Sequence, residues 1–465
     1  MPRRWIVAAL ASLALGSLAA GCGAAAAPRG GGSRTAGAAD RRIAAGASVR
    51  RVAAAPSWPT YGGTNSRGAS YPEPATGRVA RLWRTPALDG LVYAQPVWQG
   101  ETAYVATEND TVYALDLRSG RVLWRSHVGT PVPLRDLPCG DIDPLGITGT
   151  PVLGGGRLYV AAEVQPTAQR LFALDPATGK VLGSWNLDLA GTHAAAQQQR
   201  GALTYLNGTV YVPLGGLYGD CGAYVGQVVA VRPGGAVSAY RVPTAREGAI
   251  WATAGLSVGQ DGSLYAATGN SASDKAWDGG DSVLRLAPDL KLLDSFTPAD
   301  FPYLNQSDLD LGSTSPLPLP GGLVFQVGKA GVGYLLGAKD LGGIGHPLAS
   351  GAVCPGGAYG ADAYAGGLVY VPCADGLVAL RASPGGFKVL WRSMGWDAGP
   401  PVVGGGAVFS VSVATSQLRV LSAADGRPLQ AADLSGAVHF DPLALAPGEV
   451  LAAAGRRVEA FALRP

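Results

Sequence analysis

Residues 96–124 read PVWQGETAYVATENDTVYALDLRSGRVLW, and the pattern returns at residues 151–185 as PVLGGGRLYVAAEVQPTAQRLFALDPATGKVLGSW. In both copies a short apolar segment leads to a Gly turn, after which apolar and polar residues alternate. A second run ends in Ala-Leu-Asp, and another Gly turn leads to a last apolar run. Alternation with a period of two, bounded by Gly, Pro, Asp and Ser, is typical of β-strands rather than helices. The two copies therefore predict a repeated unit of short antiparallel strands.

The unit recurs along the rest of the chain, and each copy has one large apolar residue in its second strand. These residues follow one another at intervals of about 40 to 60 residues, which is the range of β-propeller blades. The sequence therefore predicts an all-β fold, an eight-bladed β-propeller. The eight anchor residues are Tyr104, Tyr159, Tyr211, Tyr265, Phe325, Tyr370, Phe409 and Leu451.

The two ends of the repeat region complement each other. The eighth copy stops after its third strand, at Pro465, whereas residues 79–84, VARLWR, resemble a fourth strand with no blade before it. The same motif, VLWR, closes other copies at residues 122–125 and 389–392. We expect the N-terminal strand to complete the last blade, because this closes the ring and removes an exposed sheet edge.

Composition fits a large folded domain and gives no sign of a nucleic-acid partner. Hydrophobic residues make up 47% of the 465 residues and charged residues only 15%, which excludes general disorder. The net charge of +3 is close to neutral, so we expect no nucleic acid as ligand. We expect residues 56–465 to form the propeller and the protein to be a monomer.

The N-terminus is typical of an exported lipoprotein. Residues 1–22 combine Arg3 and Arg4 with an apolar stretch and end in LAAGC, which resembles a bacterial lipobox with Cys22 as the lipidated residue. The alternative is ordinary cleavage in the Ala-rich stretch after Cys22. Residues 23–55 are rich in Ala, Gly and Arg and predict a disordered tether. We expect an exported protein anchored by Cys22 to the outer face of the bacterial cell membrane.

Four cysteines remain after export, and in an oxidising compartment they predict two disulfides, with three possible connectivities. Cys354 and Cys373 flank a short segment of the sixth copy, which favours a bridge between them. Cys139 then pairs with Cys221 and joins long loops of the second and third copies. The chain has no Cys-x-x-Cys motif and no His cluster, so the sequence does not predict zinc or haem c.

The repeat motifs VYALDLRSGRVLW and LFALDPATGKVL resemble the signature of the PQQ-repeat, quinoprotein alcohol dehydrogenase-like family of eight-bladed propellers. The resemblance covers roughly residues 58–465. The family includes PQQ-dependent dehydrogenases and also non-catalytic relatives, such as an outer-membrane assembly lipoprotein. The motif is therefore informative about the fold and much less so about activity.

In the family's dehydrogenases, PQQ lies between a Trp ring and a disulfide of adjacent cysteines. A Ca²⁺ ion is held by Glu, Asn and Asp, and an Asp acts as general base. The resemblance implies that Trp251 is the stacking residue and that Asn270 is a cofactor-binding residue and Ca²⁺ ligand. It places the catalytic role at Asp308 or Asp310, with Asp310 also a metal ligand.

The chain departs from this pattern at two places. Gly140 stands where the family has the second of the adjacent cysteines, and Asp220-Cys221 stands where the first Ca²⁺-binding Glu is expected. Ordinary structural roles compete with each functional one: Trp251 as a packed residue, Asn270 as a turn residue, and the two aspartates as hydrogen-bond partners of loop backbone.

The leading hypothesis is a surface-anchored, non-catalytic propeller that binds other molecules through its loops and needs no cofactor. Its partner is expected to be a wall polymer, a secreted protein or a small ligand in the axial funnel. The first alternative is a PQQ- and Ca²⁺-dependent alcohol or sugar dehydrogenase with a rearranged site. The second is a scaffold for envelope protein assembly.

Overall fold

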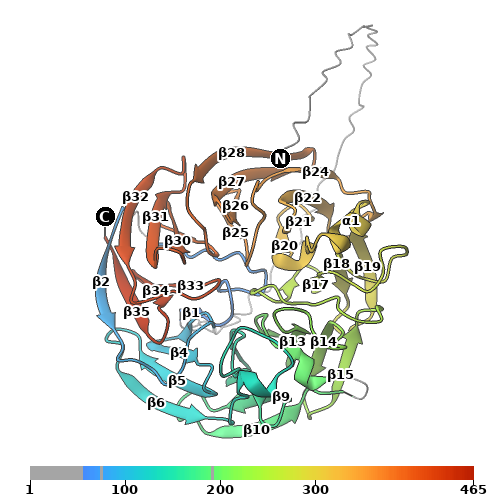
Figure 1. Ribbon diagram of the computed structural model, residues 1–465. Coiled ribbons are helices and arrows are strands. Elements are labelled where there is room, and N and C mark those ends of the chain that lie inside the picture. The colour runs from blue at the N-terminus through green and yellow to red at the C-terminus, as the bar shows by residue number, and fades with distance from the viewer. Residues whose placement is uncertain (1–55, 74–76, 190–192, 465) are drawn as a thin grey trace, which may run out of the picture. The chain divides into compact units, whose positions relative to one another are not determined.

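Residues 56–73, 77–189 and 193–464 are described by a computed structural model, and they form eight sheets arranged as blades around an axis (Figure 1). Neighbouring strands are antiparallel except for the outermost pair of blade 4, and in every blade but the eighth the strands run in sequence order from the axis to the rim. Blades 1, 3 and 4 each include an additional short strand: β1 (Ser57–Trp58), β11 (Gln197–Gln198) and β23 (Gly343–Ile344).

The first four blades follow the repeat pattern read from the sequence. Their strands are β3 (Val97–Gln99), β4 (Thr102–Ala106), β5 (Thr111–Asp116), β6 (Val122–His127); β7 (Val152–Gly154), β8 (Arg157–Val164), β9 (Ala168–Leu174), β10 (Val181–Asn186); β12 (Thr204–Leu206), β13 (Thr209–Gly216), β14 (Gln227–Val231), β15 (Val237–Arg241); and β16 (Ser257–Val258), β17 (Leu264–Ala267), β18 (Val283–Leu286), β19 (Leu292–Thr297).

The last four blades have the same order, except that blade 8 takes its outer strand from the N-terminal part of the chain. Their strands are β20 (Leu317–Leu319), β21 (Leu323–Val327), β22 (Val332–Gly337), β24 (Ala349–Ala352); β25 (Ala363–Ala365), β26 (Leu368–Cys373), β27 (Gly376–Ser383), β28 (Gly386–Met394); β29 (Val402–Gly404), β30 (Ala407–Ser412), β31 (Gln417–Ser422), β32 (Pro428–Asp433); and β33 (Leu443–Ala446), β34 (Glu449–Ala453), β35 (Val458–Arg464), β2 (Arg78–Arg84).

The core consists of apolar layers between neighbouring blades. In β4, Tyr104 and Ala106 pack in the layer shared with blade 2, whereas Val105 packs in the layer on the opposite face. Successive residues of a strand point to opposite faces, so a blade that is covered on both faces needs apolar residues at both. This explains why the second strand of each repeat is a nearly continuous apolar run.

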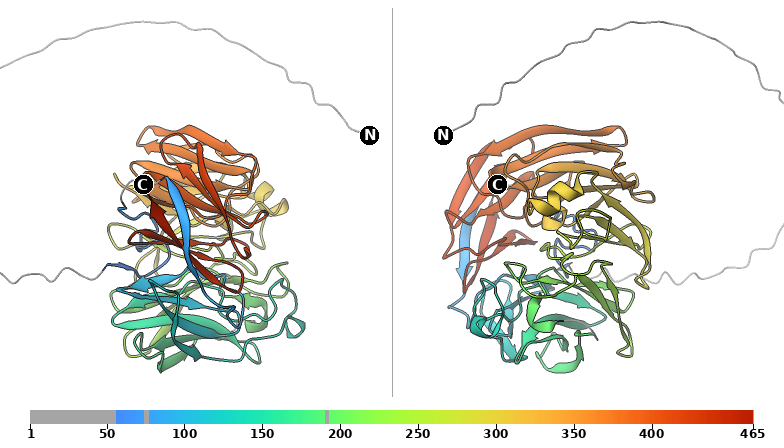
Figure 2. Two further views of the ribbon diagram at one scale, coloured as in Figure 1. Left: turned by 90° about the vertical axis from the view of Figure 1, so that its left-hand side faces the viewer. Right: turned by 45° about the vertical axis from the view of Figure 1, so that its right-hand side comes forward.

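The ring closes as the sequence predicts. β2 pairs with β35 in antiparallel register, from Arg78 opposite Arg464 to Arg84 opposite Glu459. Figure 2 shows β2 lying along the C-terminal strands, although hundreds of residues separate them in the sequence. The eighth blade therefore has four strands, and its third strand is not left as a free edge.

A Trp–Gly contact between neighbouring blades explains the repeat signature. The Trp of one outer strand lies on the Gly of the next blade's third-to-fourth strand turn, where a Cβ would collide with the ring. The glycine also has positive φ, which side chains disfavour. In each pair the indole N–H donates to a backbone carbonyl of the next blade. The pairs are Trp83–Gly120, Trp124–Gly179 and Trp391–Gly426.

The N-terminal segment before β2 also fills the centre of the ring. Tyr61 packs against Ala202, Ala254 and Ala361, which come from three different blades. Arg67 is buried and donates hydrogen bonds to carbonyls of blades 3 and 4 and of its own segment. This part of the chain therefore ties blades together at the axis as well as at the rim.

Helical structure is sparse and lies in the loops. The described helices are α1 (Phe301–Gln306), η1 (Leu134–Asp136), η2 (Ala194–Ala196) and η3 (Leu311–Ser313). Within the described part of the chain, no helix combines the length and apolarity needed to cross a membrane. The predicted signal segment, Cys22 and the tether lie outside the described residues.

Two disulfides brace the loops. Cys139 is bonded to Cys221, with Cα atoms 6.2 Å apart, and Cys354 is bonded to Cys373 across 19 residues. These are the two pairings expected from the sequence. The first links the connection between β6 and β7 to the loop after β13 in blade 3. The second links the connection between β24 of blade 5 and β25 to the end of β26 in blade 6.

Candidate functional site

Three of the four residues singled out by the family resemblance meet in one polar network. The backbone N–H of Asn270 donates to Asp310 Oδ1 at 2.8 Å, and its Nδ2 donates to Asp308 Oδ1 at 3.0 Å. Lys329 Nζ lies 2.8 Å from both Asp308 Oδ1 and Asp310 Oδ2. One ammonium group therefore bridges two carboxylates at the loop ends of blades 4 and 5.

The backbone explains why the sequence is glycine-rich at this point. Gly269 and Gly328 precede Asn270 and Lys329 directly. A Cβ at Gly269 would lie 2.6 Å from Asp310 Oδ1, and a Cβ at Gly328 would lie 2.6 Å from the Asp310 carbonyl oxygen. Neither loop tolerates a side chain at its glycine, because Asp310 occupies the space between them.

Trp251, the fourth predicted residue, lies beside this network. Lys329 Nζ is 5.7 Å from the centre of the Trp251 ring, which is a cation–π distance. Burial lowers the pKa of Lys329, but Asp310 and Asp308 outweigh it and hold that pKa above its usual value. Lys329 is therefore a permanent cation that the two aspartates and the indole share.

Trp251 belongs to a group of half-buried aromatic residues, here called the axial aromatic cluster: Trp251, Phe440, Tyr359 and Tyr93. Phe440 lies 6.3 Å from Trp251 and stacks on Tyr359 at 6.3 Å with an interplanar angle of 16°. The Arg200 guanidinium lies 5.3 Å from the Tyr93 ring and 5.5 Å from the Phe440 ring. Loops of distant blades thus contribute aromatic rings to one surface.

Phe440 adopts φ +62, in the left-handed region. This conformation is unusual for a bulky side chain and costs on the order of 1–3 kcal/mol. It persists because Phe440 is held between Trp251, Tyr359 and Arg200. Strain of this kind occurs most often where a binding surface fixes the geometry of a residue.

The Cys139–Cys221 bridge packs near the same surface. Both sulfurs join an apolar cluster that includes Leu217 and Tyr93. Asp220, the residue before Cys221, accepts a hydrogen bond from Tyr224, and burial raises the pKa of the Asp220 carboxyl. The position where the family has a Ca²⁺-binding Glu therefore carries an aspartate that is already hydrogen-bonded.

The described side chains fit the family's two cofactor groups unequally. Asn270 Oδ1 is buried without a hydrogen-bond partner, and an amide oxygen is a suitable Ca²⁺ ligand. However, residues 56–73, 77–189 and 193–464 contain no group of three or more His, Cys, Asp or Glu side chains able to hold a metal. The quinone fits less well, because the disulfide joins cysteines 82 residues apart and not two adjacent cysteines.

A second set of ionisable groups is buried between blades 1 and 2. Glu108, Asp110 and Glu163 are each at most 1% exposed, and both oxygens of Asp110 lack a hydrogen-bond partner in the structure. Burial, reinforced by Glu108, raises the pKa of Asp110 to about 8. Burial also raises the pKa of Glu108, to about 7. Carboxyl groups buried between blades 1 and 2 are therefore protonated in part near neutral pH.

Sequence reasoning missed Lys329, Phe440 and Arg200. Lys329 had a usable signal, because Gly328-Lys329 follows the second strand of blade 5 as Gly269-Asn270 follows that of blade 4. Phe440 and Arg200 lie in loops outside the repeat pattern. Only the closing of the ring brings these two residues together.

The comparisons with known proteins agree with this architecture. The family model described as outer membrane protein assembly factor BamB matches residues 72–286. Tetrathionate hydrolase of Acidithiobacillus ferrooxidans is 29% identical over 129 residues, which are 28% of this chain and 23% of that protein. The chain thus matches less than a quarter of the length of that relative.

Solved structures with the same fold include natural enzymes and a designed protein. Quinohemoprotein alcohol dehydrogenase ADHIIG of Pseudomonas putida HK5 aligns over 88% of this chain and 80% of its own, with a TM-score of 0.67 and 16% identity. A europium-containing methanol dehydrogenase aligns over 88% and 98%, with a TM-score of 0.68 and 15% identity. The designed protein Ika8 aligns over 82% and 99%, with a TM-score of 0.55 and 12% identity. The chain therefore has the eight-bladed β-propeller fold of these structures, and part of it matches a model of PQQ-type repeats.

Proposed function

We propose that the chain is a non-catalytic binding module whose axial aromatic cluster holds a ligand. The observation that carries this proposal is the gathering of Trp251, Phe440 and Tyr359 from distant loops at one surface. A dehydrogenase of the family needs a carboxylate beside its cofactor that can act as base. Here Asp308 and Asp310 share one ammonium group, so neither is available as an unpaired base.

The chemistry of the cluster favours a sugar unit as the ligand. Binding sites for small molecules combine apolar and aromatic surface with a few polar groups that fix orientation. Trp251 and Phe440 provide aromatic surface, while Arg200, Asn270 and Asp308 provide donors and acceptors around it. A sugar ring has one apolar face and several hydroxyl groups, which match this arrangement.

A wall polymer is the source of such sugars that fits the expected location. An exported chain anchored at Cys22 places its propeller next to the cell wall. The proposed role is therefore to hold or sense a wall glycan at the outer face of the membrane. The protein acts as a monomer and needs neither nucleic acid nor a cofactor.

The test is tryptophan fluorescence of the full chain titrated with a soluble peptidoglycan glycan fragment of alternating N-acetylglucosamine and N-acetylmuramic acid. Trp251→Ala and Phe440→Ala are expected to weaken binding at least tenfold. Tyr218→Ala is the matched control, because Tyr218 is an aromatic residue that is 72% exposed and does not belong to the cluster. Equal affinity in the wild type, the cluster variants and the control contradicts the proposal.

The buried, unpartnered Asn270 Oδ1 favours a second candidate, the PQQ- and Ca²⁺-dependent alcohol or sugar dehydrogenase. Dye reduction by the full chain with PQQ, Ca²⁺ and a panel of alcohols and sugars tests this candidate. Turnover that is lost in Asn270→Ala supports it. A rate equal to that of the protein-free control excludes it for the substrates used.

The match of residues 72–286 to the assembly-factor model favours a third candidate, a scaffold for envelope protein assembly. Affinity purification of the full chain from its own membranes tests it. Recovery of a defined set of membrane-protein assembly factors supports this role. If no assembly factors are recovered and the chain binds the glycan, the scaffold role is rejected in favour of the glycan-binding role.

A further inference from the structure

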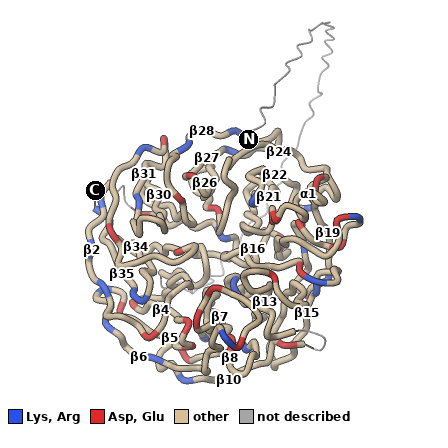
Figure 3. The backbone as a smooth tube through the Cα atoms, viewed as in Figure 1, with Lys and Arg blue, Asp and Glu red and all other residues tan. Residues whose placement is uncertain are grey.

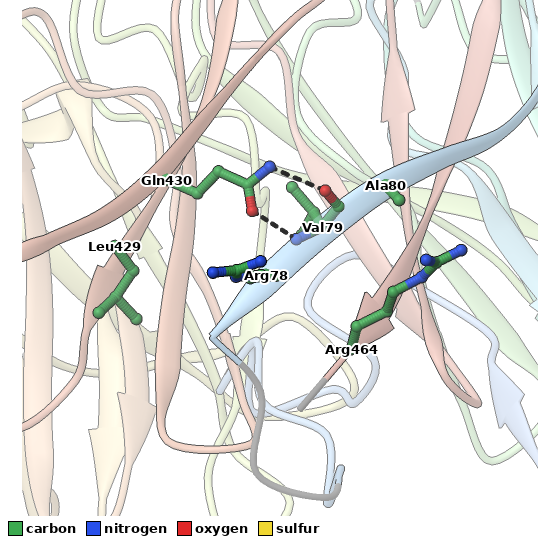
Figure 4. Close-up of a pocket in the computed structure, with 6 residues that line it drawn as sticks. All are labelled: Arg78, Val79, Ala80, Leu429, Gln430 and Arg464. Carbon is green, nitrogen blue, oxygen red and sulfur yellow. Dashed lines mark hydrogen bonds between the residues drawn. The ribbon is translucent and has the colours of Figure 1, made fainter.

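A cavity of about 610 Å³ opens at the outer end of the ring-closure seam, far along the blades from the aromatic cluster. It lies between the outer strand of blade 7, β32, and the closing strand β2 with its partner β35. Figure 4 shows the residues that line it. The six lining residues are Arg78, Val79, Ala80, Leu429, Gln430 and Arg464.

One side chain fixes the wall of this cavity. The backbone N–H of Val79 donates to Gln430 Oε1 at 2.8 Å, and Gln430 Nε2 donates to the Val79 carbonyl at 2.8 Å. The Gln430 amide thus pairs with the free edge of β2 as a neighbouring strand does, and it bridges two blades (Figure 4). A wall held by two hydrogen bonds is preformed, so a ligand need not order it.

Among the described residues that line the pocket, the charged ones are Arg78 and Arg464. Both are exposed and lie opposite each other in the β2–β35 register. Like charges opposite each other in a ladder destabilise the pair. Each arginine also has an interaction within the chain.

The other arginines of β2 have different roles. Arg81 pairs with Glu459 of β35 at 2.8 Å and also donates to the Asp433 carbonyl of β32, and Arg84 donates to Ser435, just after β32, at 3.0 Å. Both side chains therefore connect β2 to the end of blade 7, and neither is among the lining residues. Figure 3 shows basic residues along this side of the ring, where β2 and β35 meet. The cavity therefore lies in a locally basic part of a nearly neutral protein.

We propose that this seam pocket binds an elongated ligand with two phosphate-type anionic groups. Guanidinium groups bind phosphate and carboxylate oxygens in bidentate geometry. In Figure 4 Arg78 extends toward Gln430 and Arg464 extends toward the Ala80 side, so the two anionic groups of the ligand lie apart. Leu429 and Val79 give the middle of the pocket an apolar surface. The volume is in the range of small-molecule sites.

The experiment is a thermal-shift and calorimetric titration of the full chain with 1,6-hexanediol bisphosphate, which separates two phosphate groups by an apolar chain, with sodium chloride at matched ionic strength as reference. Suberate serves as a second probe that carries two separated carboxylates. Arg464→Gln and Arg78→Gln are expected to weaken binding of the bisphosphate about tenfold each. Arg125→Gln is the matched control, because Arg125 is an exposed arginine on the outer strand of blade 1.

Leu429→Trp provides a second test that leaves the charge unchanged, since the larger side chain fills the pocket. Stabilisation by the bisphosphate that is lost in this variant and in both arginine variants supports the proposal. Stabilisation by suberate as well extends the ligand class to dicarboxylates. A wild-type response no larger than that to chloride, or equal responses in all variants, overturns it.

Discussion

Trp83→Ala tests the ring closure at its weakest point. Trp83 lies on the closing strand, is 8% exposed, and packs on Gly120 of the first blade. Its indole N–H donates to the Leu117 carbonyl at 3.0 Å. The substitution therefore removes the contact that joins the last blade to the first without altering the β2–β35 pairing.

The expected cost follows from the burial and the hydrogen bond. Truncating a buried Trp to Ala costs about 3–5 kcal/mol. The lost hydrogen bond adds about 1 kcal/mol. The free energy of unfolding should therefore fall by about 4–6 kcal/mol. Trp83→Phe keeps a ring on Gly120 and loses the N–H donor, so it should cost about 1–2 kcal/mol.

The assay is urea unfolding of the full chain followed by circular dichroism and by intrinsic fluorescence. Trp124→Ala is the matched control, because Trp124 makes the same contact with Gly179 inside the ring but is only half-buried. Trp83→Ala should destabilise more than this control. A loss below about 1 kcal/mol, or a loss smaller than that of Trp124→Ala, refutes the view that this contact holds the seam.

Three further predictions concern charge and cross-links. Burial raises the pKa of Asp110 to about 8 from 3.8, so the folded state keeps a proton that the unfolded chain releases, and the free energy of unfolding falls as pH rises between these values. In Asp110→Asn the free energy of unfolding should fall less between pH 5 and pH 8 than in the wild type, by on the order of a few kcal/mol. Parallel pH profiles of the two proteins in urea unfolding would contradict this prediction. Lys329→Met removes the cation between the carboxylates of Asp308 and Asp310, which then repel each other. The melting temperature should therefore fall at low salt and fall less at 1 M salt, where the repulsion is screened. An unchanged melting curve would show that these ion pairs do not contribute to stability. Replacing Cys354 and Cys373 together by Ser should cost about 3 kcal/mol in urea unfolding, because their bridge closes a loop of 19 residues; no loss would show that the blade alone fixes this segment.

Much of the fold could be predicted because the same strand pattern recurs in every copy of the repeat. Tyr104 and its seven counterparts all lie in second strands, and VARLWR at residues 79–84 lies in the outer strand of blade 8. The same local pattern forms the same strand in each blade, so an error in one copy does not change the assignment. Ring closure followed from the complementary ends alone.

The candidate site was harder to predict because it depends on long-range contacts. Asn270, Asp308 and Asp310 meet as the resemblance suggests, but the sequence does not show that Lys329 bridges the aspartates. Phe440 comes from a loop 189 residues after Trp251 and has no repeat position. The seam pocket likewise exists only where β32 and β2 come together.

The thermal stability of the full chain with PQQ and Ca²⁺, added separately and together, distinguishes a binding module from a quinone-dependent enzyme. A ligand that binds only the folded state adds about 2.7 kcal/mol at 100 times its Kd. Because Cys139 is bonded to Cys221 and not to an adjacent cysteine, we predict no shift at saturating PQQ, with or without Ca²⁺. A PQQ shift that requires Ca²⁺ and disappears in Asn270→Ala contradicts it and makes the chain a quinone-dependent enzyme.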